Sequence, residues 1–288
     1  MIIGGPLARV ALATALLGIA SVAHSQQKDA AANSLLQIRY EAPADARLRP
    51  HYDELMRRRV LERLQGFLVP LRLSKPLLAR AAQCGAETVP YRSGGPVTLC
   101  YEQLERIATI AAKNAKDPNE RSMVLFGTTV QSLLHQLAIA VFDQLEVPVW
   151  GRLHDAADRV AALIMVEFSE KVALTTVLGS GKFFLYSGNT WTGADFAKAD
   201  SPQAQRFYNF LCIAYGGDPL TFAFLAPRPG PSAFPRLTEH RAPRCEGEYL
   251  QIRHAFDLRI MSFVDPDQLV AVRAKQWLQP DEMPEVPR

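Results

Sequence analysis

The chain has 288 residues, of which 48% are hydrophobic and 21% are charged. A disordered chain would carry fewer apolar residues and a larger net charge, so this composition predicts a folded protein with a sizeable core. The 32 Lys and Arg residues nearly balance the 29 Asp and Glu residues, and the resulting net charge of +3 excludes a strongly basic nucleic-acid-binding protein.

The first 25 residues are typical of a secretory signal. Arg9 precedes a short apolar run over residues 10–20, and the small-x-small sequence Ala23-His24-Ser25 follows it. The run is shorter than the roughly 20 residues that a membrane-spanning helix needs, although an uncleaved anchor is the alternative. We therefore expect residues 1–25 to be removed and residues 26–34 to form a polar leader. The mature protein should be periplasmic or secreted, with no membrane span.

The remaining pattern predicts a mostly helical chain with a few strands near its start. Residues 35–40 have the composition of a strand, and residues 69–101, which are broken by prolines, suit short strands and turns. Helices are expected over residues 51–68, 102–114, 121–145, 153–169, 202–216 and 246–263. The helix over 121–145 is apolar almost all round, which indicates a central buried helix.

Two other segments are expected to be irregular. The glycine-rich residues 178–182 lack the full phosphate-loop pattern and are interpreted as a turn. Residues 226–244 contain several prolines and suit an extended loop. No internal repeat or clear domain boundary is visible. We therefore expect residues 35–265 to form a single domain, followed by a C-terminal tail over residues 266–288.

Cysteine usage agrees with export. The chain has four cysteines and no C-x-x-C pair, so a zinc ribbon or a thioredoxin motif has no support. In an oxidising compartment we expect disulfides between Cys84 and Cys100 and between Cys212 and Cys245, each closing a local loop. Four cysteines allow three pairings, and free thiols are the expectation if the first residues are not a signal.

Three polar residues near the apolar helix are candidates for a site. His135 lies inside that helix, where a histidine is more often a hydrogen-bonded core residue than a metal ligand. Asp155 and Asp158 are three residues apart and share one helix face. Two acids there suit a cation, but they equally suit capping and pairing with Arg152 or Arg159.

The order of several motifs resembles one bacterial family of metallopeptidases of unknown function. In that family a long helix carries H-E-x-G-H, and an L-P-V-x-G-R-E-E-D-A-A-D block follows; the corresponding segments here are 135–139 and 148–158. Further matches are Cys84-Gly85, Cys100-Tyr101-Glu102, Gln205-Arg206-Phe207-Tyr208-Asn209, Cys212, Tyr215-Gly216, Asp218-Pro219 and Arg241-Ala242. The resemblance covers roughly residues 35–265. It implies a zincin-like α+β fold that is mostly α, with a small strand-rich N-terminal part.

The metal-binding half of the family pattern has changed in this chain. Active zincins bind zinc through two histidines four residues apart, and the glutamate after the first is the general base. The resemblance puts Gln136 at the base position and Ile139 at the second ligand position. Glutamine cannot accept the proton, and isoleucine has no lone pair. The family's Glu-Glu is Leu153-His154 here, and its histidine near Asp200 is missing.

The resemblance thus implies a retained scaffold with lost chemistry, in which Arg206, Asp155 and Asp158 form a buried polar network. We predict a non-catalytic pseudo-peptidase, without a metal cofactor, that binds a peptide, a cell-envelope protein or a partner subunit. The alternative is an active zinc peptidase with a rearranged ligand set of His135, His154 and either Asp155 or Asp158, which leaves one position open for water. A purely structural role is a third interpretation.

Overall fold

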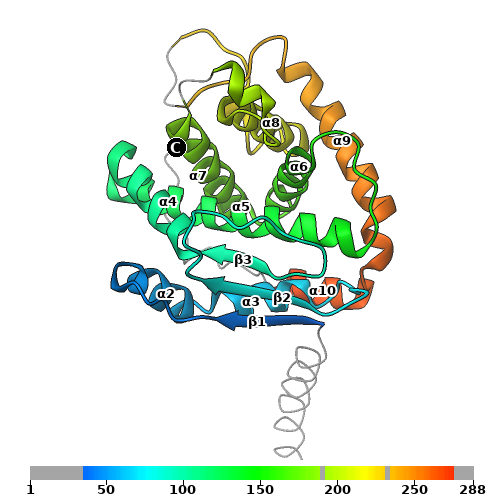
Figure 1. Ribbon diagram of the computed structural model, residues 1–288. Helices are drawn as coiled ribbons and strands as arrows, with labels where there is room; N and C mark the ends of the chain where they lie inside the picture. The colour runs from blue at the N-terminus through cyan, green and yellow to red at the C-terminus, as the bar shows by residue number, and fades with distance from the viewer. Residues whose placement is uncertain (1–34, 189–191, 231–233, 276–288) are drawn as a thin grey trace, which may run out of the picture.

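A parallel three-stranded sheet forms one end of the molecule and a group of helices forms the rest (Figure 1). The computed structural model describes residues 35–275 except 189–191 and 231–233, so the predicted signal and polar leader lie outside the described residues. The strands are β1 (Leu36–Tyr40), β2 (Leu77–Ala82) and β3 (Val97–Cys100). The α-helices are α2 (Arg49–Arg57), α3 (Val60–Leu68), α4 (Tyr101–Asn114), α5 (Pro118–Gln144), α6 (Leu153–Val166), α7 (Glu170–Ser187), α8 (Gln203–Gly217), α9 (Ala242–Arg259) and α10 (Pro266–Lys275). Short 3-10 helices are η1 (Ala46–Leu48), η2 (Gly193–Ala197), η3 (Ala223–Leu225) and η4 (Met261–Phe263).

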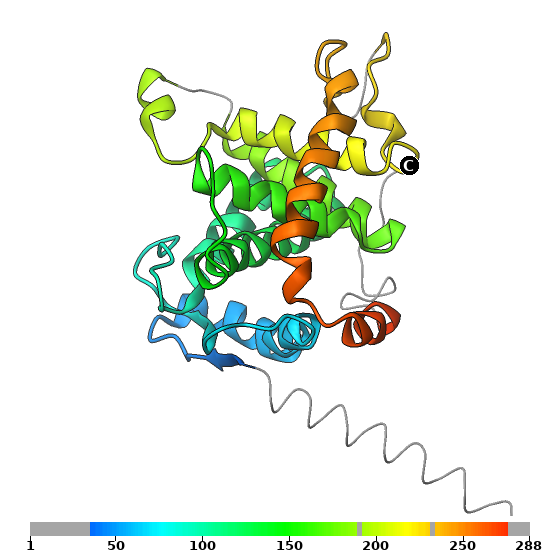
Figure 2. The same cartoon turned by 90° about the vertical axis from the view of Figure 1, so that its right-hand side faces the viewer.

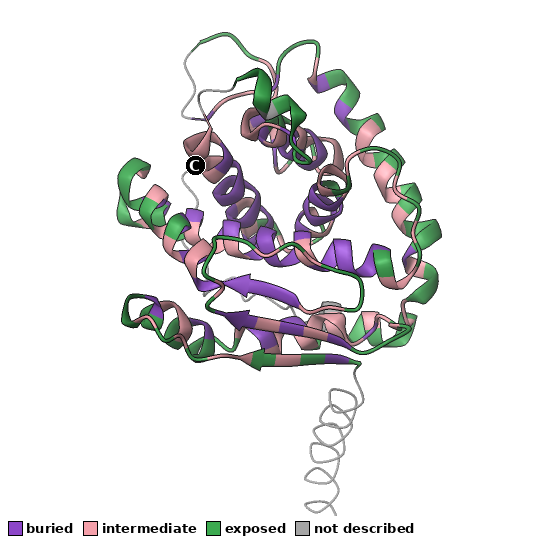
Figure 3. Ribbon diagram, viewed as in Figure 1, coloured by how far each residue is buried: buried purple, intermediate pink, exposed green. Residues whose placement is uncertain are grey.

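The sheet is ordered β1-β2-β3, with Ile38 opposite Ala79 and Ala81 opposite Leu99. Every residue of β3 is buried, whereas β1 alternates between covered and exposed positions at the outer edge (Figure 3). This difference arises because β3 packs against α5 while β1 borders solvent. The predicted α+β fold that is mostly α, with its strands near the start, is confirmed.

Helix α5 lies at the centre of the helical part, as its apolar sequence predicts. It contacts α4, α6 and α7 and carries side chains of all three apolar clusters of the core. Among the described helices it is the one long and apolar enough to cross a membrane, but 78% of its 18-residue apolar window is buried inside the protein. Such burial is what a core helix shows.

The predicted turn at residues 178–182 is wrong, because this segment lies inside α7, a helix that the sequence analysis did not predict. Gly179 in this segment allows close helix packing and does not form a turn. A Cβ atom at Gly179 would collide with the carbonyl oxygen of Met123 on α5, and one at Gly127 would lie 2.6 Å from the carbonyl oxygen of Thr176. The Ser180 hydroxyl donates to the Thr176 carbonyl oxygen at 2.8 Å, so this polar side chain is satisfied within its own helix.

This close approach makes a prediction. The substitution Gly179→Ala should lower the free energy of unfolding by about 1–3 kcal/mol, because the added methyl group forces α5 and α7 apart. The matched control is Gly66→Ala in α3, where nothing lies within 4 Å of the added atom. There alanine should raise stability by up to about 1 kcal/mol. Urea unfolding measures both, and a Gly179→Ala protein as stable as the wild type would contradict the packing argument.

Two further boundaries differ from the prediction. The helix expected over residues 51–68 is two helices, α2 and α3, and the break falls at Arg59, whose φ of 52° lies in the left-handed region. The first part of the predicted C-terminal tail forms α10. The chain before α10 is fixed to the α3–β2 connection, since the Asp265 amide donates to the Pro70 carbonyl oxygen at 2.8 Å.

Both predicted disulfides are present. Cys84–Cys100 joins the chain after β2 to the end of β3, and Cys212–Cys245 joins α8 to α9. The described residues contain no free cysteine. Two disulfides in one chain are typical of proteins of an oxidising compartment.

Candidate functional site

The carboxylate of Asp158, on α6, is the centre of a buried polar network. It accepts hydrogen bonds from Gln131 Nε2 at 2.8 Å and from His135 Nδ1 at 2.7 Å, both on α5. Arg206 on α8 donates twice, from Nε at 2.7 Å and from Nη2 at 3.0 Å. Gln131, His135 and Asp158 are each at most 7% exposed. Three helices therefore converge on one carboxylate whose two oxygens are both engaged.

The charges of this network are set by its pairing. Burial alone would raise the pKa of Asp158, but the Arg206 guanidinium and the hydrogen bond from His135 outweigh it and hold that pKa well below its usual range. The pKa of Arg206 is correspondingly raised by Asp158, against the effect of its own burial. The guanidinium also lies over the ring of Phe184, 4.6 Å from the centroid, in a cation–π contact. Asp158 is thus a paired, ionised carboxylate.

Of the three residues expected in a polar network, Asp155 contributes its charge, which helps to raise the pKa of Arg206, but its hydrogen bond goes to Ser201. Its Oδ2 accepts a hydrogen bond from the Ser201 hydroxyl at 2.7 Å. Nearby, Arg152 donates to the carbonyl oxygens of Phe196 at 2.8 Å and Asp200 at 3.2 Å. These bonds fix residues 196–201 against the start of α6.

The second ring nitrogen of His135 faces another histidine. His135 Nε2 lies 3.1 Å from His154 Nδ1, and the two ring planes are within 9° of parallel. The ring centroids are 5.3 Å apart, whereas the facing nitrogens are 3.1 Å apart, so the two nitrogens lie between the ring centres. The rings therefore lie nearly end to end and not one above the other. His154 Nδ1 is also 3.4 Å from Asp200 Oδ1. Burial lowers the pKa of His154, with Asp200 acting in the opposite direction, and the neutral imidazole is favoured.

These contacts limit where the protons of the pair lie. Because Asp158 is an ionised acceptor, His135 Nδ1 carries a proton. In the contact between His135 Nε2 and His154 Nδ1, one nitrogen donates and the other accepts. A carboxylate that orients a histidine through one ring nitrogen is the arrangement seen behind metal-bound imidazoles. Here the other ring nitrogen is occupied by a neighbouring side chain.

The donors near His135 do not converge as zinc ligands do. Two imidazole nitrogens on a tetrahedral zinc, each about 2.0–2.1 Å from the ion, lie about 3.3 Å apart with both lone pairs aimed at the metal. His135 Nε2 and His154 Nδ1 have a similar separation of 3.1 Å, but in the nearly end-to-end rings they point at each other. Asp158 has no free oxygen, and Asp155 is bound to Ser201. Ile139 is 6% exposed and packs in an apolar cluster with Phe142 and Val160. The structure therefore joins His135, His154 and Asp158 in one chain of contacts but does not converge them on a common point.

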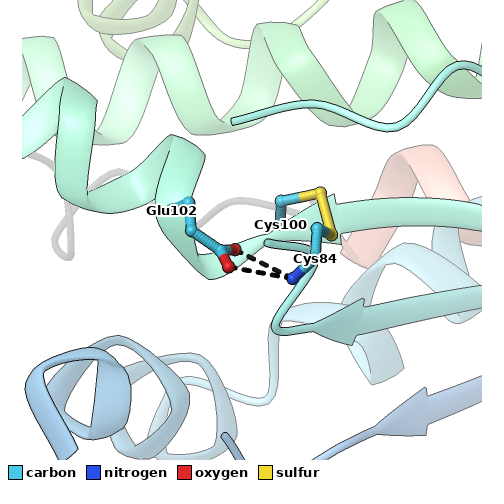
Figure 4. A group of neighbouring side chains, drawn as sticks. All are labelled: Cys84, Cys100 and Glu102. Carbon is cyan, nitrogen blue, oxygen red and sulfur yellow. Dashed lines mark hydrogen bonds between the residues drawn. A yellow bond between two sulfur atoms is a disulfide. The ribbon is translucent and has the colours of Figure 1, made fainter. Parts of the chain in front are cut away.

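A group of three ligand-type side chains does occur elsewhere in the described part of the chain. Cys84, Cys100 and Glu102 place their ligand atoms within 4.8 Å of one another (Figure 4). The two sulfur atoms form the disulfide, so neither is a thiolate. The Glu102 carboxylate accepts from the backbone amides of Cys84 at 3.0 Å and Gly85 at 2.7 Å. This cluster fastens the β2–β3 loop to the start of α4.

Sequence reasoning missed two members of the site. Gln131 lies one helical turn before His135, and the i, i+4 spacing of two polar side chains on an apolar helix was an available signal. Asp200 is the carboxylate beside His154. The sequence analysis used it only to mark where the family's histidine is missing. Its contact depends on the path of the 196–201 segment, which no local pattern specifies.

Three exposed apolar side chains, called the apolar rim here, lie near His154 in the chain or through one backbone contact. Trp150 is 94% exposed, and Leu153 and Phe196 are 40% and 47% exposed. Leu153 precedes His154, Trp150 lies four residues before it, and Arg152 donates to the Phe196 carbonyl oxygen. Where large apolar side chains form a contiguous exposed patch, they are typical of interaction sites.

Comparison with known proteins bears on the family. A family model described as "putative metallopeptidase" matches residues 40–258, most of the chain and all elements of the site. No curated protein and no solved structure matches. The matched range includes His135, Asp158 and Arg206. The chain is therefore a member of this putative metallopeptidase family.

Proposed function

We propose that this family member is a non-catalytic binding protein, exported to an oxidising compartment, that holds an apolar peptide segment of a partner beside His154. The observation that carries the proposal is the engagement of His135 at both ring nitrogens, by Asp158 and by His154. A metal would have to displace the contact with His154 to reach His135 Nε2.

The loss of a proton acceptor supports the same conclusion. The residue after His135 is Gln136, whose carboxamide cannot take a proton from water at neutral pH. A general base contributes about 10²- to 10⁴-fold to such reactions. With the ligand position Ile139 buried among apolar side chains, peptide hydrolysis would lack both its metal and its base.

The apolar rim supports binding rather than a purely structural role. Trp150 is almost fully exposed, and tryptophan is among the residues that contribute most at protein interfaces. Leu153 and Phe196 are also exposed, and Leu153 adjoins His154, which lies 3.4 Å from Asp200. This combination suits an extended peptide that carries apolar side chains, from a cell-envelope protein or a partner subunit.

Three measurements on the purified protein test the proposal. We expect no stoichiometric zinc by mass spectrometry of the metal content, no hydrolysis of a mixed 12-residue peptide library, and binding of a subset of those peptides. Trp150→Ala should weaken that binding at least 10-fold, about 1.4 kcal/mol. Leu220→Ala, which removes an 88% exposed leucine elsewhere, is the matched control and should leave binding unchanged.

One result would reverse the assignment in favour of the rearranged zinc enzyme. That result is stoichiometric zinc together with hydrolysis, both lost in His135→Ala and in His154→Ala and abolished by a chelator. Such an outcome would mean that the short His135–His154 separation opens around an ion. Unchanged peptide binding in Trp150→Ala would argue against the rim.

A further inference from the structure

A second concave feature lies on the other side of α5 and α6 from His135. It is a cavity of about 470 Å³ bounded by the end of α3, by α5, α6 and α9, and by the C-terminal segment η4–α10. Figure 2 shows α9 running down the side of the molecule to α10, which lies beside α3. This volume is within the range of about 300–1,000 Å³ found for small-molecule pockets.

The walls of the cavity are apolar. Helix α5 contributes Leu134, Leu137 and Val141, and α6 contributes Leu163. Phe256 on α9 faces them across the space. Of the described lining residues, all but three carry apolar side chains, so the interior offers almost no hydrogen-bonding partner to a ligand.

The three polar lining residues are close together. Glu167 and Arg253 form an ion pair with a 2.5 Å separation, and Ser169 is two residues beyond Glu167 in the α6–α7 connection. The Glu167 and Arg253 side chains are more than a third exposed, so this end of the cavity meets solvent. The cavity thus has an apolar interior and one polar mouth.

The unpaired Ser169 hydroxyl and the local charge indicate which kind of head group fits the mouth of the cavity. The Ser169 hydroxyl oxygen is buried and has no hydrogen-bond partner among the described residues. A ligand with a hydroxyl or amide group would satisfy it. Arg253 already pairs with two carboxylates, Glu167 and Asp257, so the mouth has no spare positive charge for an anion.

We propose that this cavity binds a single-chain lipid with an uncharged head group. The alkyl chain lies between α5, α6 and α9, and the head-group hydroxyl bonds to Ser169. The far wall is held by contacts within the protein, because Arg72 pairs with Asp265 at 3.1 Å and Leu71 forms a backbone bridge to Val264.

The test uses the purified protein and the uncharged dye N-phenyl-1-naphthylamine, whose fluorescence rises in apolar surroundings. We expect saturable dye uptake, displacement by 1-oleoylglycerol, and weaker displacement by oleate because of the Glu167 charge. Ser169→Ala should weaken 1-oleoylglycerol binding about 3- to 10-fold, the effect of one hydrogen bond. Ser187→Ala is the matched control, since Ser187 also has a buried, unpartnered hydroxyl but does not line the cavity.

A cavity-filling variant gives an independent readout. Val141→Trp should reduce dye uptake more than 10-fold while the far-UV circular dichroism stays unchanged. The proposal is wrong if the dye is not taken up, if a folded Val141→Trp protein takes it up normally, or if Ser169→Ala binds 1-oleoylglycerol as the wild type does. It is also wrong if uptake requires removal of residues 276–288, since the chain itself would then be the occupant. None of these measurements depends on the His135 site.

Discussion

Replacing Asp158 with alanine should lower the free energy of unfolding by about 3–5 kcal/mol, the usual cost of removing one partner of a buried ion pair. The Arg206 guanidinium would lose the carboxylate that holds both its Nε and Nη2. Gln131 and His135 would lose the acceptor of their hydrogen bonds in the same step. Urea unfolding followed by circular dichroism measures the change.

Two controls separate this effect from the general cost of a helix substitution. Asp155→Ala removes a partly buried carboxylate three residues away on the same helix, which is bonded to Ser201, and should cost about 1 kcal/mol. The pair Asp158→Ala with Arg206→Met should cost less than the sum of the single changes, because no charge is left unpaired. Additive losses would mean that the ion pair does not dominate the network.

The change of stability with pH is a further test of the Asp158 ion pair. The pKa of Asp158 in the folded protein lies well below that in the unfolded chain, which is about 3.9. The stabilisation is therefore fully present above about pH 4 and is lost as the pH falls toward the folded-state pKa. The stability difference between the wild type and Asp158→Asn should be constant near neutral pH and shrink on acidification. A difference that grows on acidification would contradict the assignment.

Most features that the sequence predicted depend on a pattern within one segment. The apolar run around Leu133 and Leu137 has to be buried, and α5 is therefore central. The two disulfides join cysteines that are only 16 and 33 residues apart. The buried pair of Asp158 with Arg206 is the exception, because it joins two segments and was expected, together with Asp155, only from the family resemblance.

The features that were missed depend on contacts between distant segments. Gly179 lies in a helix, where the absence of a side chain lets α5 approach closely. Nothing in the sequence near residue 179 reveals that neighbour. Asp155 and Asp158 are equivalent by spacing, yet Asp158 pairs with Arg206 whereas Asp155 is bonded to Ser201. The end-to-end contact of His135 with His154 likewise follows from how α6 leaves the loop after α5. A local sequence pattern carries no information on such relative placements.

Replacing Gln136 and Ile139 with the residues of the family pattern should recreate a metal site. The loss of stability that this causes should be measurable before the metal is added. In the double variant Gln136→Glu, Ile139→His, an imidazole replaces an isoleucine that is 6% exposed in an apolar cluster. We expect the free energy of unfolding to fall by about 2–4 kcal/mol, from lost apolar contacts and from burial of a polar ring. Thermal unfolding without zinc measures this loss.

Zinc should then recover much of the lost stability. Residues 135 and 139 lie about one helical turn apart, so two imidazoles there share a face. Zinc would displace the 3.1 Å contact between His135 Nε2 and His154 Nδ1, which would make His154 a third donor. At zinc concentrations 100-fold above the dissociation constant, binding to the folded state contributes about 2.7 kcal/mol. Gln136→Glu alone is the control and should show no zinc-dependent shift, because it adds no imidazole at residue 139.

The same variant decides whether Ile139 alone prevents metal binding or whether the contacts around His135 and Asp158 prevent it as well. If zinc raises the unfolding temperature of the double variant and His135→Ala removes that effect, the surrounding helices still hold a metal-binding geometry, and Ile139 alone closes it. If the double variant is destabilised and zinc has no effect, the contacts of Asp158 with Arg206 and of His135 with His154 have fixed the site in a form that excludes the ion. The second result would contradict this prediction while leaving the binding role untouched, since the apolar rim around Trp150 does not include residue 139.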